Sequence, residues 1–184
     1  NLKVYVWTPA NTKATSAPST HDTHHTPPTS TLLYLHGGPG GGTPPDLPRL
    51  FDTTHLQIVA FDQRGCGRSE AADRLRHNTL DHLVADVEAV RAALGIDAWG
   101  VMGSSYGVLV AALYVARHSE AVAFALLHGV FLGSADEIDW LFRPGGAARF
   151  YPLEWEALEA CRRRHAVSDD ESDGASEGGL RTWH

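Results

Sequence analysis

The stretch that decides the fold reads Trp99-Gly-Val-Met-Gly-Ser-Ser-Tyr-Gly107 and continues into an apolar segment at residues 108–118. Residues 99–102 favour a short buried strand, and the segment after the second glycine favours a buried helix. Between them, Gly103 to Gly107 fits the pattern Gly-x-Ser-x-Gly, which places a serine on a sharp strand-to-helix turn. Side chains two residues before and after that serine would collide, so glycine is needed there. The spacing predicts Ser105 as a nucleophile and excludes Ser104.

Two further apolar runs precede this turn, and each ends in a glycine-rich loop. Residues 31–36 lead into His36-Gly-Gly-Pro-Gly-Gly-Gly42, and residues 57–62 lead into Gln63-Arg-Gly-Cys-Gly-Arg-Ser69. Residues 2–8 alternate as a strand, and residues 121–130 favour another buried strand. Residues 80–94 carry one apolar helical face, with Asn78 able to cap its start and Gly95 at its end. Strands this apolar, separated by helices, predict an α/β fold with a mostly parallel sheet in three layers.

The composition excludes several functional classes. The 184 residues carry 15 Lys and Arg against 22 Asp and Glu, and their only cluster of cations is 162–164, which argues against nucleic-acid binding. There is no uninterrupted apolar run of membrane-spanning length, so we expect no membrane partner. Two cysteines and no recognisable signal peptide favour the cytoplasm. We expect no metal site, because His21, His24 and His25 lie in a segment that cannot fix ligand geometry. We also expect no cofactor.

Three segments differ in composition from the expected core. Residues 9–30 are rich in Thr, Ser, Pro and His and predict a mobile insertion. Residues 134–164 hold several aromatic side chains and predict helices outside the sheet, whereas the acidic residues 165–184 predict a disordered tail. The expected organisation is therefore a sheet-containing region at 1–133, a helical region at 134–164 and the tail.

A nucleophilic serine needs hydrogen-bond donors for the oxyanion that forms during acyl transfer. The first helical residue after the turn, Tyr106, offers its main-chain N–H together with the positive end of the helix dipole. The second donor is expected from the loop after an earlier strand, and we assign it to Gly38 in preference to Gly37.

The two glycine-rich loops and the turn at Ser105, in this order, resemble the proline iminopeptidase (prolyl aminopeptidase) family of α/β-hydrolases, which are serine peptidases. Residues 139–155 resemble the start of that family's helical cap, and the whole resemblance covers about residues 31–156. The resemblance implies release of an N-terminal proline from a peptide through an acyl-enzyme on Ser105. It also implies that two loops shape the active site, with the residues His36, Gly37, Pro39, Gly40, Asp62, Gln63, Arg64 and Gly65. Cys66 stands where the family usually has serine.

Catalysis by such a serine also needs an acid and a histidine, which follow it in that order. The resemblance places both beyond the cap, so we expect a chain truncated after the strand that follows the nucleophile helix, and inactive by itself. His128 ends that strand, but any acid would follow it in the chain, so we interpret His128 as structural. We interpret His118 as a partner of a helix end. The alternatives are a serine esterase or epoxide-hydrolase-like enzyme, and a non-catalytic relative that acts as a binding module.

Overall fold

The computed structural model describes residues 1–8, 30–69, 73 and 76–165. It divides into two compact units, Asn1–Leu132 and Gly133–His184, which are treated separately here. The predicted mobile insertion at 9–30 lies outside the described residues, except that Ser30 begins a strand. The predicted acidic tail also lies outside them, except that His165 ends a helix. The histidines considered above as metal ligands fall in the first of these two segments.

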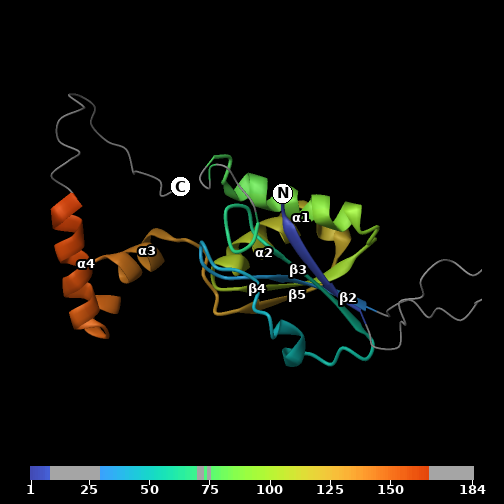
Figure 1. The fold of residues 1–184 in the computed structure, drawn as a ribbon, viewed down its shortest axis with the longest axis horizontal. Coiled ribbons are helices and arrows are strands. Elements are labelled where there is room, and N and C mark those ends of the chain that lie inside the picture. The colour runs from blue at the N-terminus through green and yellow to red at the C-terminus, as the bar shows by residue number, and fades with distance from the viewer. Residues whose placement is uncertain (9–29, 70–72, 74–75, 166–184) are drawn as a thin grey trace, which may run out of the picture. The chain divides into compact units, whose positions relative to one another are not determined.

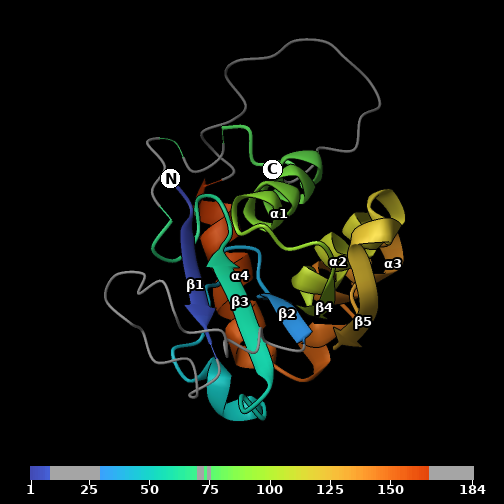
Figure 2. The same ribbon diagram turned by 90° about the vertical axis from the view of Figure 1, so that its right-hand side faces the viewer.

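The first unit is built on a five-stranded sheet. Its strands are β1 (Lys3–Trp7), β2 (Ser30–Leu35), β3 (Leu56–Asp62), β4 (Trp99–Ser104) and β5 (Val122–His128), and their order across the sheet is β1-β3-β2-β4-β5. Figure 2 shows the strands in this order, with β1 and β5 at the two edges. Only β1 runs antiparallel to its neighbour, and the other pairs are parallel. The prediction of a mostly parallel sheet is confirmed.

The two faces of the sheet are covered unequally. Helices α1 (Leu80–Ala93) and α2 (Tyr106–Arg117) pack on one face, where residues such as Leu33, Val59 and Val101 form the main core. On the opposite face, the short 3₁₀ helix η1 (Leu47–Leu50) covers Ile58 and Ala60. Figure 1 shows α1 and α2 on one side of the strands and η1, between β2 and β3 in the sequence, on the other. Parallel strands need cover on both faces, and η1 supplies it over β3.

The ends of α1 differ from the prediction at both termini. Thr79, not Asn78, is the N-cap, and its hydroxyl accepts a hydrogen bond from the N–H of His82. The Asn78 amide instead donates to the carbonyl of Arg64 at 3.2 Å. Leu94 was expected on the buried face but is the C-cap and is 41% exposed, because the helix has already ended when its side chain would reach the core.

The expectation that the last strand is buried is wrong. Val122 is half-buried, and every other residue of β5 is exposed, including Phe124, Leu126 and Leu127 at 45–48%. The physical reason is the position of β5, which pairs with β4 along one edge and is the outermost strand among the described residues. Apolar composition therefore indicated a strand correctly but not its burial.

The second unit contains the helices that were expected outside the sheet. Helix α3 (Ala135–Phe142) begins with a capping box between Ser134 and Glu137, and α4 (Pro152–His165) follows the short η3 (Ala147–Arg149). Gly146 packs so tightly on the carbonyl of Trp140 that a β-carbon there would overlap it. Among the helices of the described segments, none combines the length and the apolar character needed to cross a bilayer. The assignment of this unit to a cap remains a prediction.

Candidate active site

Ser105 lies between β4 and α2 in a strained conformation, with φ 53° and ψ −120°. A non-glycine residue in this region costs about 1–3 kcal/mol and persists only where its surroundings hold it. The Ser105 N–H donates to the carbonyl of His128 at 2.9 Å, and its carbonyl accepts from the N–H of Val108 at 2.8 Å. These two bonds tie the turn to the end of β5 on one side and to the first turn of α2 on the other.

The two glycines that flank Ser105 are required because main-chain atoms occupy the space of a side chain. A β-carbon at Gly103 would overlap the carbonyl oxygen of Gly107, and one at Gly107 would overlap the carbonyl oxygen of Leu35 at the end of β2. The start of α2 can therefore lie directly against β2 and β4. The steric requirement expected from the Gly-x-Ser-x-Gly spacing is present in the structure.

The loop after β2 lies beside the serine. A β-carbon at Gly37 would be only 3.2 Å from the β-carbon of Ser105, and Gly38 has φ +143°, which a side chain rarely tolerates. Tyr106 is the first residue of α2, so its N–H is one of the four that have no acceptor within the helix. The geometry brings the loop and this helix end together, as expected, and Gly38 and Tyr106 remain our predicted oxyanion donors.

His36 is buried at 2% exposure and serves the loop, not the proton transfer. Its Nε2 accepts a hydrogen bond from the N–H of Gln63 at 3.0 Å, and the side-chain amide of Gln63 donates to the carbonyl of His36 at 2.9 Å. Since a main-chain N–H can only donate, Nε2 carries no proton, and Nδ1–H donates to the carbonyl of Gly37 at 2.8 Å. Burial lowers the pKa of His36, which favours this neutral ring.

Asp62 ends β3 and connects both glycine-rich loops. Its carboxylate accepts from the N–H of Thr43 at 2.7 Å, the N–H of Arg68 at 2.8 Å and the hydroxyl of Tyr5 at 3.0 Å. Its carbonyl accepts from the hydroxyl of Ser69. Burial alone would raise the pKa of Asp62, but these donors stabilise the anion and hold the pKa below its ordinary value. Asp62 is therefore an anchor for the loops.

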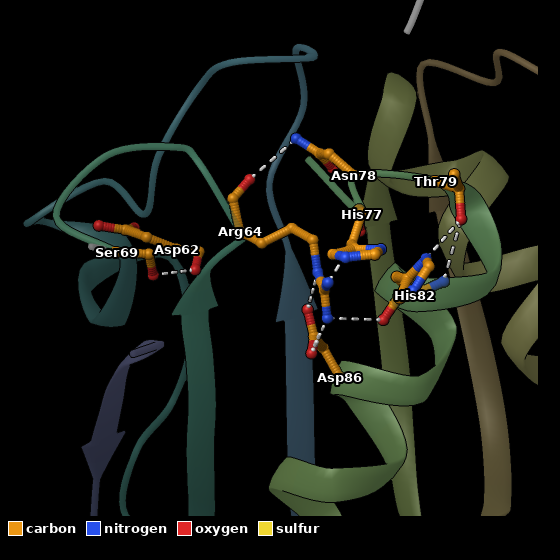
Figure 3. A network of polar contacts seen from close by, with 8 residues as sticks. All are labelled: Asp62, Arg64, Ser69, His77, Asn78, Thr79, His82 and Asp86. Carbon is orange, nitrogen blue, oxygen red and sulfur yellow. Dashed lines mark hydrogen bonds and ion pairs between the residues drawn. The ribbon is translucent and has the colours of Figure 1, made fainter. Parts of the chain in front are cut away.

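Arg64, which the resemblance places in one of the two active-site loops, takes part in a polar network with α1 (Figure 3). Its guanidinium binds the carboxylate of Asp86 through two hydrogen bonds, of 2.7 and 2.6 Å. It also donates to the carbonyl of His77 at 2.8 Å and to that of His82 at 3.4 Å. Planar two-point pairing of this kind fixes direction as well as distance. Arg64 thus attaches the second loop to α1, and Gly65 follows at the turn with φ +70°.

Several residues that organise the site had no motif in the sequence. Tyr5, Thr43 and Asp86 come from three separate regions of the chain and meet the loops only through tertiary contacts. The alternating pattern of β1 could have indicated that Tyr5 lies on one face of an edge strand, but nothing in the sequence indicated its partner. Cys66 is 8% exposed and lies next to Tyr106. Burial is the larger cause that raises the pKa of the Tyr106 hydroxyl, and the nearby thiol of Cys66 is the smaller one.

Neither His128 nor His118, the two histidines considered above, is placed as a base for Ser105. His128 reaches the serine through its main-chain carbonyl, and its exposed ring has no hydrogen bond to the serine hydroxyl. His118 caps the end of α2, stacks on Tyr114 and lies 3.9 Å from a carboxylate oxygen of Glu88. Within these segments, no group of three or more His, Cys, Asp or Glu residues is placed to hold a metal ion.

Comparison with known proteins agrees with this geometry. Residues 30–161 match the family described as alpha/beta hydrolase fold. The chain is 42% identical over 129 residues to a proline iminopeptidase of Neisseria gonorrhoeae, covering 70% of this chain and 42% of that protein. It is 46% identical over 125 residues to a proline iminopeptidase of Arabidopsis thaliana, covering 68% and 33%. The chain therefore spans less than half the length of these two relatives.

A solved structure gives the same result for the fold. The crystal structure of a proline iminopeptidase from Mycobacterium smegmatis superimposes with a TM-score of 0.56 and 24% identity, over 89% of this chain and 57% of that one. The predicted similarity to proline iminopeptidases is confirmed by the sequence relatives, and the solved structure supports the fold alone. With its parallel sheet, its strained serine between β4 and α2, and a match that extends over most of its length, the chain belongs to the alpha/beta hydrolase fold family.

Proposed function

We propose that this chain carries the nucleophile and the oxyanion-binding part of a serine hydrolase that releases an N-terminal proline from peptides. The observation that carries the proposal is the strained Ser105, held at the start of α2 beside the Gly37–Gly38 loop. The substrate class comes from the relatives named proline iminopeptidase, of which the chain spans less than half. The expected cytoplasmic location rests on the low cysteine content, two in 184 residues, which is too few for a disulfide framework.

In the proposed reaction, the hydroxyl of Ser105 attacks the carbonyl carbon of the N-terminal proline. A base removes the serine proton, and the N–H groups of Tyr106 and Gly38 bind the oxyanion of the tetrahedral intermediate. As that intermediate collapses, the protonated base gives its proton to the leaving nitrogen, which releases the remaining peptide and leaves the prolyl ester on Ser105. Water then attacks the ester, giving one proton to the same base, and the base returns it to the oxygen of Ser105 as free proline leaves. In this proposal the first unit contributes the nucleophile and the donors, and the ring of His128, the histidine that ends β5, has no hydrogen bond to the serine hydroxyl. We therefore infer that the chain by itself is inactive or nearly so.

The experiment compares the chain with two variants, Ser105→Ala and Ser104→Ala. Ser104 is the matched control because it is the adjacent serine, one residue out of the required spacing. Each protein is assayed on a proline aryl-amide and a short aryl ester, and each is treated with a fluorophosphonate that labels activated serines.

The outcomes separate the proposal from its alternatives. Amide cleavage or labelling that Ser105→Ala abolishes and Ser104→Ala retains supports the serine peptidase assignment, and turnover would overturn the inference that the chain is inactive. Ester cleavage without amide cleavage supports the esterase alternative. The last arm adds the polypeptide that lies beyond the matched region in the Neisseria gonorrhoeae relative. If neither substrate is cleaved and no serine is labelled even then, the proposal is overturned and a binding module is favoured.

A further inference from the structure

We propose that His36 is a positioning residue: its neutral ring sets the direction of the Gly37–Gly38 peptide and so aims the Gly38 N–H at the oxyanion. His36 does not touch the reacting atoms, and it acts through the loop. The inference deepens the proposed function and rests on it for the role of the oxyanion.

The first step concerns the proton on the ring. The N–H of Gln63 donates to Nε2, so the proton of the neutral ring is on Nδ1, where the carbonyl of Gly37 accepts it at 2.8 Å. The side chain of Gln63 returns a second bond to the carbonyl of His36 at 2.9 Å. Both ring nitrogens are thus committed to main-chain partners from two different loops. In a protonated ring, Nε2 would also carry a hydrogen, and this hydrogen would clash with the N–H of Gln63, which now donates to Nε2.

The second step concerns the peptide that follows. In a planar trans peptide, the carbonyl oxygen and the N–H of the next residue point to opposite sides. Because the carbonyl of Gly37 points to the His36 ring, the N–H of Gly38 points away from it. Gly37 itself lies against Ser105, since a β-carbon there would be 3.2 Å from the β-carbon of the serine. The ring therefore decides which group of this peptide is free beside the nucleophile.

The third step concerns how firmly the peptide is held. A β-carbon at Gly41 would overlap the carbonyl oxygen of Gly37 and lie 3.2 Å from Nδ1 of His36, so this hydrogen bond is enclosed by main chain. The start of α2 also packs here, because a β-carbon at Gly107 would lie 2.8 Å from the carbonyl oxygen of His36. The charged group acting on the ring is Asp62 from β3, which favours protonation, and burial of the ring opposes it more strongly. The arrangement leaves the peptide little freedom to rotate.

The test uses two half-replacements and a control. In His36→Asn, the side-chain N–H₂ occupies the position of Nδ1 and can still donate to Gly37, but the acceptor for Gln63 is lost. In His36→Gln, the amide extends towards the position of Nε2, so the acceptor is retained and the donor to Gly37 is lost. His55→Asn is the control, because His55 is exposed and precedes β3.

The direct readout is nitrogen-15 NMR of the histidine rings and of the Gly38 amide. We expect His36 to show a protonated Nδ1 and an unprotonated Nε2 at neutral pH, and to gain its second proton at a lower pH than an exposed histidine does, because burial lowers its pKa. The Gly38 amide resonance should stay near its original position in His36→Asn and His55→Asn, and move in His36→Gln. A ring protonated on Nε2, or a Gly38 resonance that moves equally in both His36 variants, would overturn the inference.

The kinetic readout applies wherever Ser105-dependent turnover is present. Loss of an oxyanion donor lowers kcat by about 10²–10³-fold, and a misdirected donor in His36→Gln should lower kcat at least about tenfold with little change in KM. An equal loss in His36→Asn would contradict the positioning role. If the chain shows neither turnover nor Ser105-dependent labelling, even when the polypeptide beyond the matched region is added, the proposed function fails, whereas the ring tautomer and the Gly38 resonance still decide the inference on His36.

Discussion

Replacement of Asp62 by asparagine isolates the contribution of one carboxylate to the two loops around Ser105. The side chain keeps its shape, but only one of its two end atoms can accept a hydrogen bond. The N–H groups of Thr43 and Arg68 both donate to the carboxylate, at 2.7 and 2.8 Å, so one of them must face an N–H₂ group in the variant. Losing one hydrogen bond to a charged group costs about 1.5–3 kcal/mol, and the other is weakened because its acceptor is now neutral.

The expected loss for Asp62→Asn is therefore about 3 kcal/mol in the free energy of unfolding at pH 7. For a chain of this size that corresponds to a fall of about 6–12 °C in Tm. The pKa of Asp62 is lowered in the folded state, so its stabilisation is complete above the ordinary carboxyl pKa of about 4 and is lost as the pH falls through the folded value. The difference between the two proteins should accordingly shrink below about pH 4.

The assay is urea unfolding followed by tryptophan fluorescence, at pH 7 and at several lower pH values. Asp52→Asn is the matched control, because Asp52 also accepts a hydrogen bond from a main-chain N–H, that of Thr54 at 2.9 Å, but is exposed, so that water can replace the lost acceptor. A loss below about 1 kcal/mol in Asp62→Asn, or a difference that stays constant at low pH, would refute the assigned role of the charge.

Three further predictions concern the framework. Hydrogen bonds from Arg91, followed by that from Tyr114, lower the pKa of Glu88 to about 2. Glu88→Gln should therefore lower the free energy of unfolding by about 1–2 kcal/mol in urea at pH 7, after allowance for the partial exposure of Glu88. This loss should become smaller as the pH falls from 4.5 towards 2, and a loss that does not change with pH would contradict the prediction. Gly107→Ala should destabilise by about 1–3 kcal/mol in the same assay although alanine favours helices, and a stabilised variant would show that the contact with β2 is not tight. Leu126 is exposed on the edge strand β5, and such an apolar edge can pair with another copy of the chain. Leu126→Lys should therefore raise the monomer fraction in size-exclusion chromatography, and an unaltered chain that is monomeric at every concentration would contradict this.

The fold was accessible from sequence because its signals are local. A buried strand that runs into a glycine-rich segment is recognisable within about ten residues. The sequence has three such transitions, and the third leads directly into a helix. The predicted strands agree with the structure to within two residues at most ends, as at β3 and β4. The spacing of Gly103 and Gly107 around Ser105 also carries its own steric reason, which the structure shows as close main-chain contacts.

Burial and side-chain partners were not accessible in the same way. The apolar residues of β5 look like those of a central strand, yet the strand lies at the sheet edge, and edge or centre is decided by the order of pairing. Arg64 stands in a loop motif, but its direction depends on Asp86, which lies 22 residues away on α1. Neither distance along the chain nor residue type indicates such a contact, because it exists only after the elements have packed.

The sequence by itself determined that this chain is an α/β protein with a serine on a sharp strand-to-helix turn. It could do so because apolar runs and the spacing of glycines depend only on residues that are close together in the chain. Only the tertiary structure decided what holds that serine and its loops in place. The N–H of Gln63 donates to Nε2 of His36 and so determines which ring nitrogen carries the proton. The carboxylate of Asp62 accepts hydrogen bonds from the N–H groups of Thr43 and Arg68, and the N–H of Ser105 donates to the carbonyl of His128. Each of these bonds joins groups that are brought together by the packing of parallel strands, whose carboxyl ends meet at one edge of the sheet.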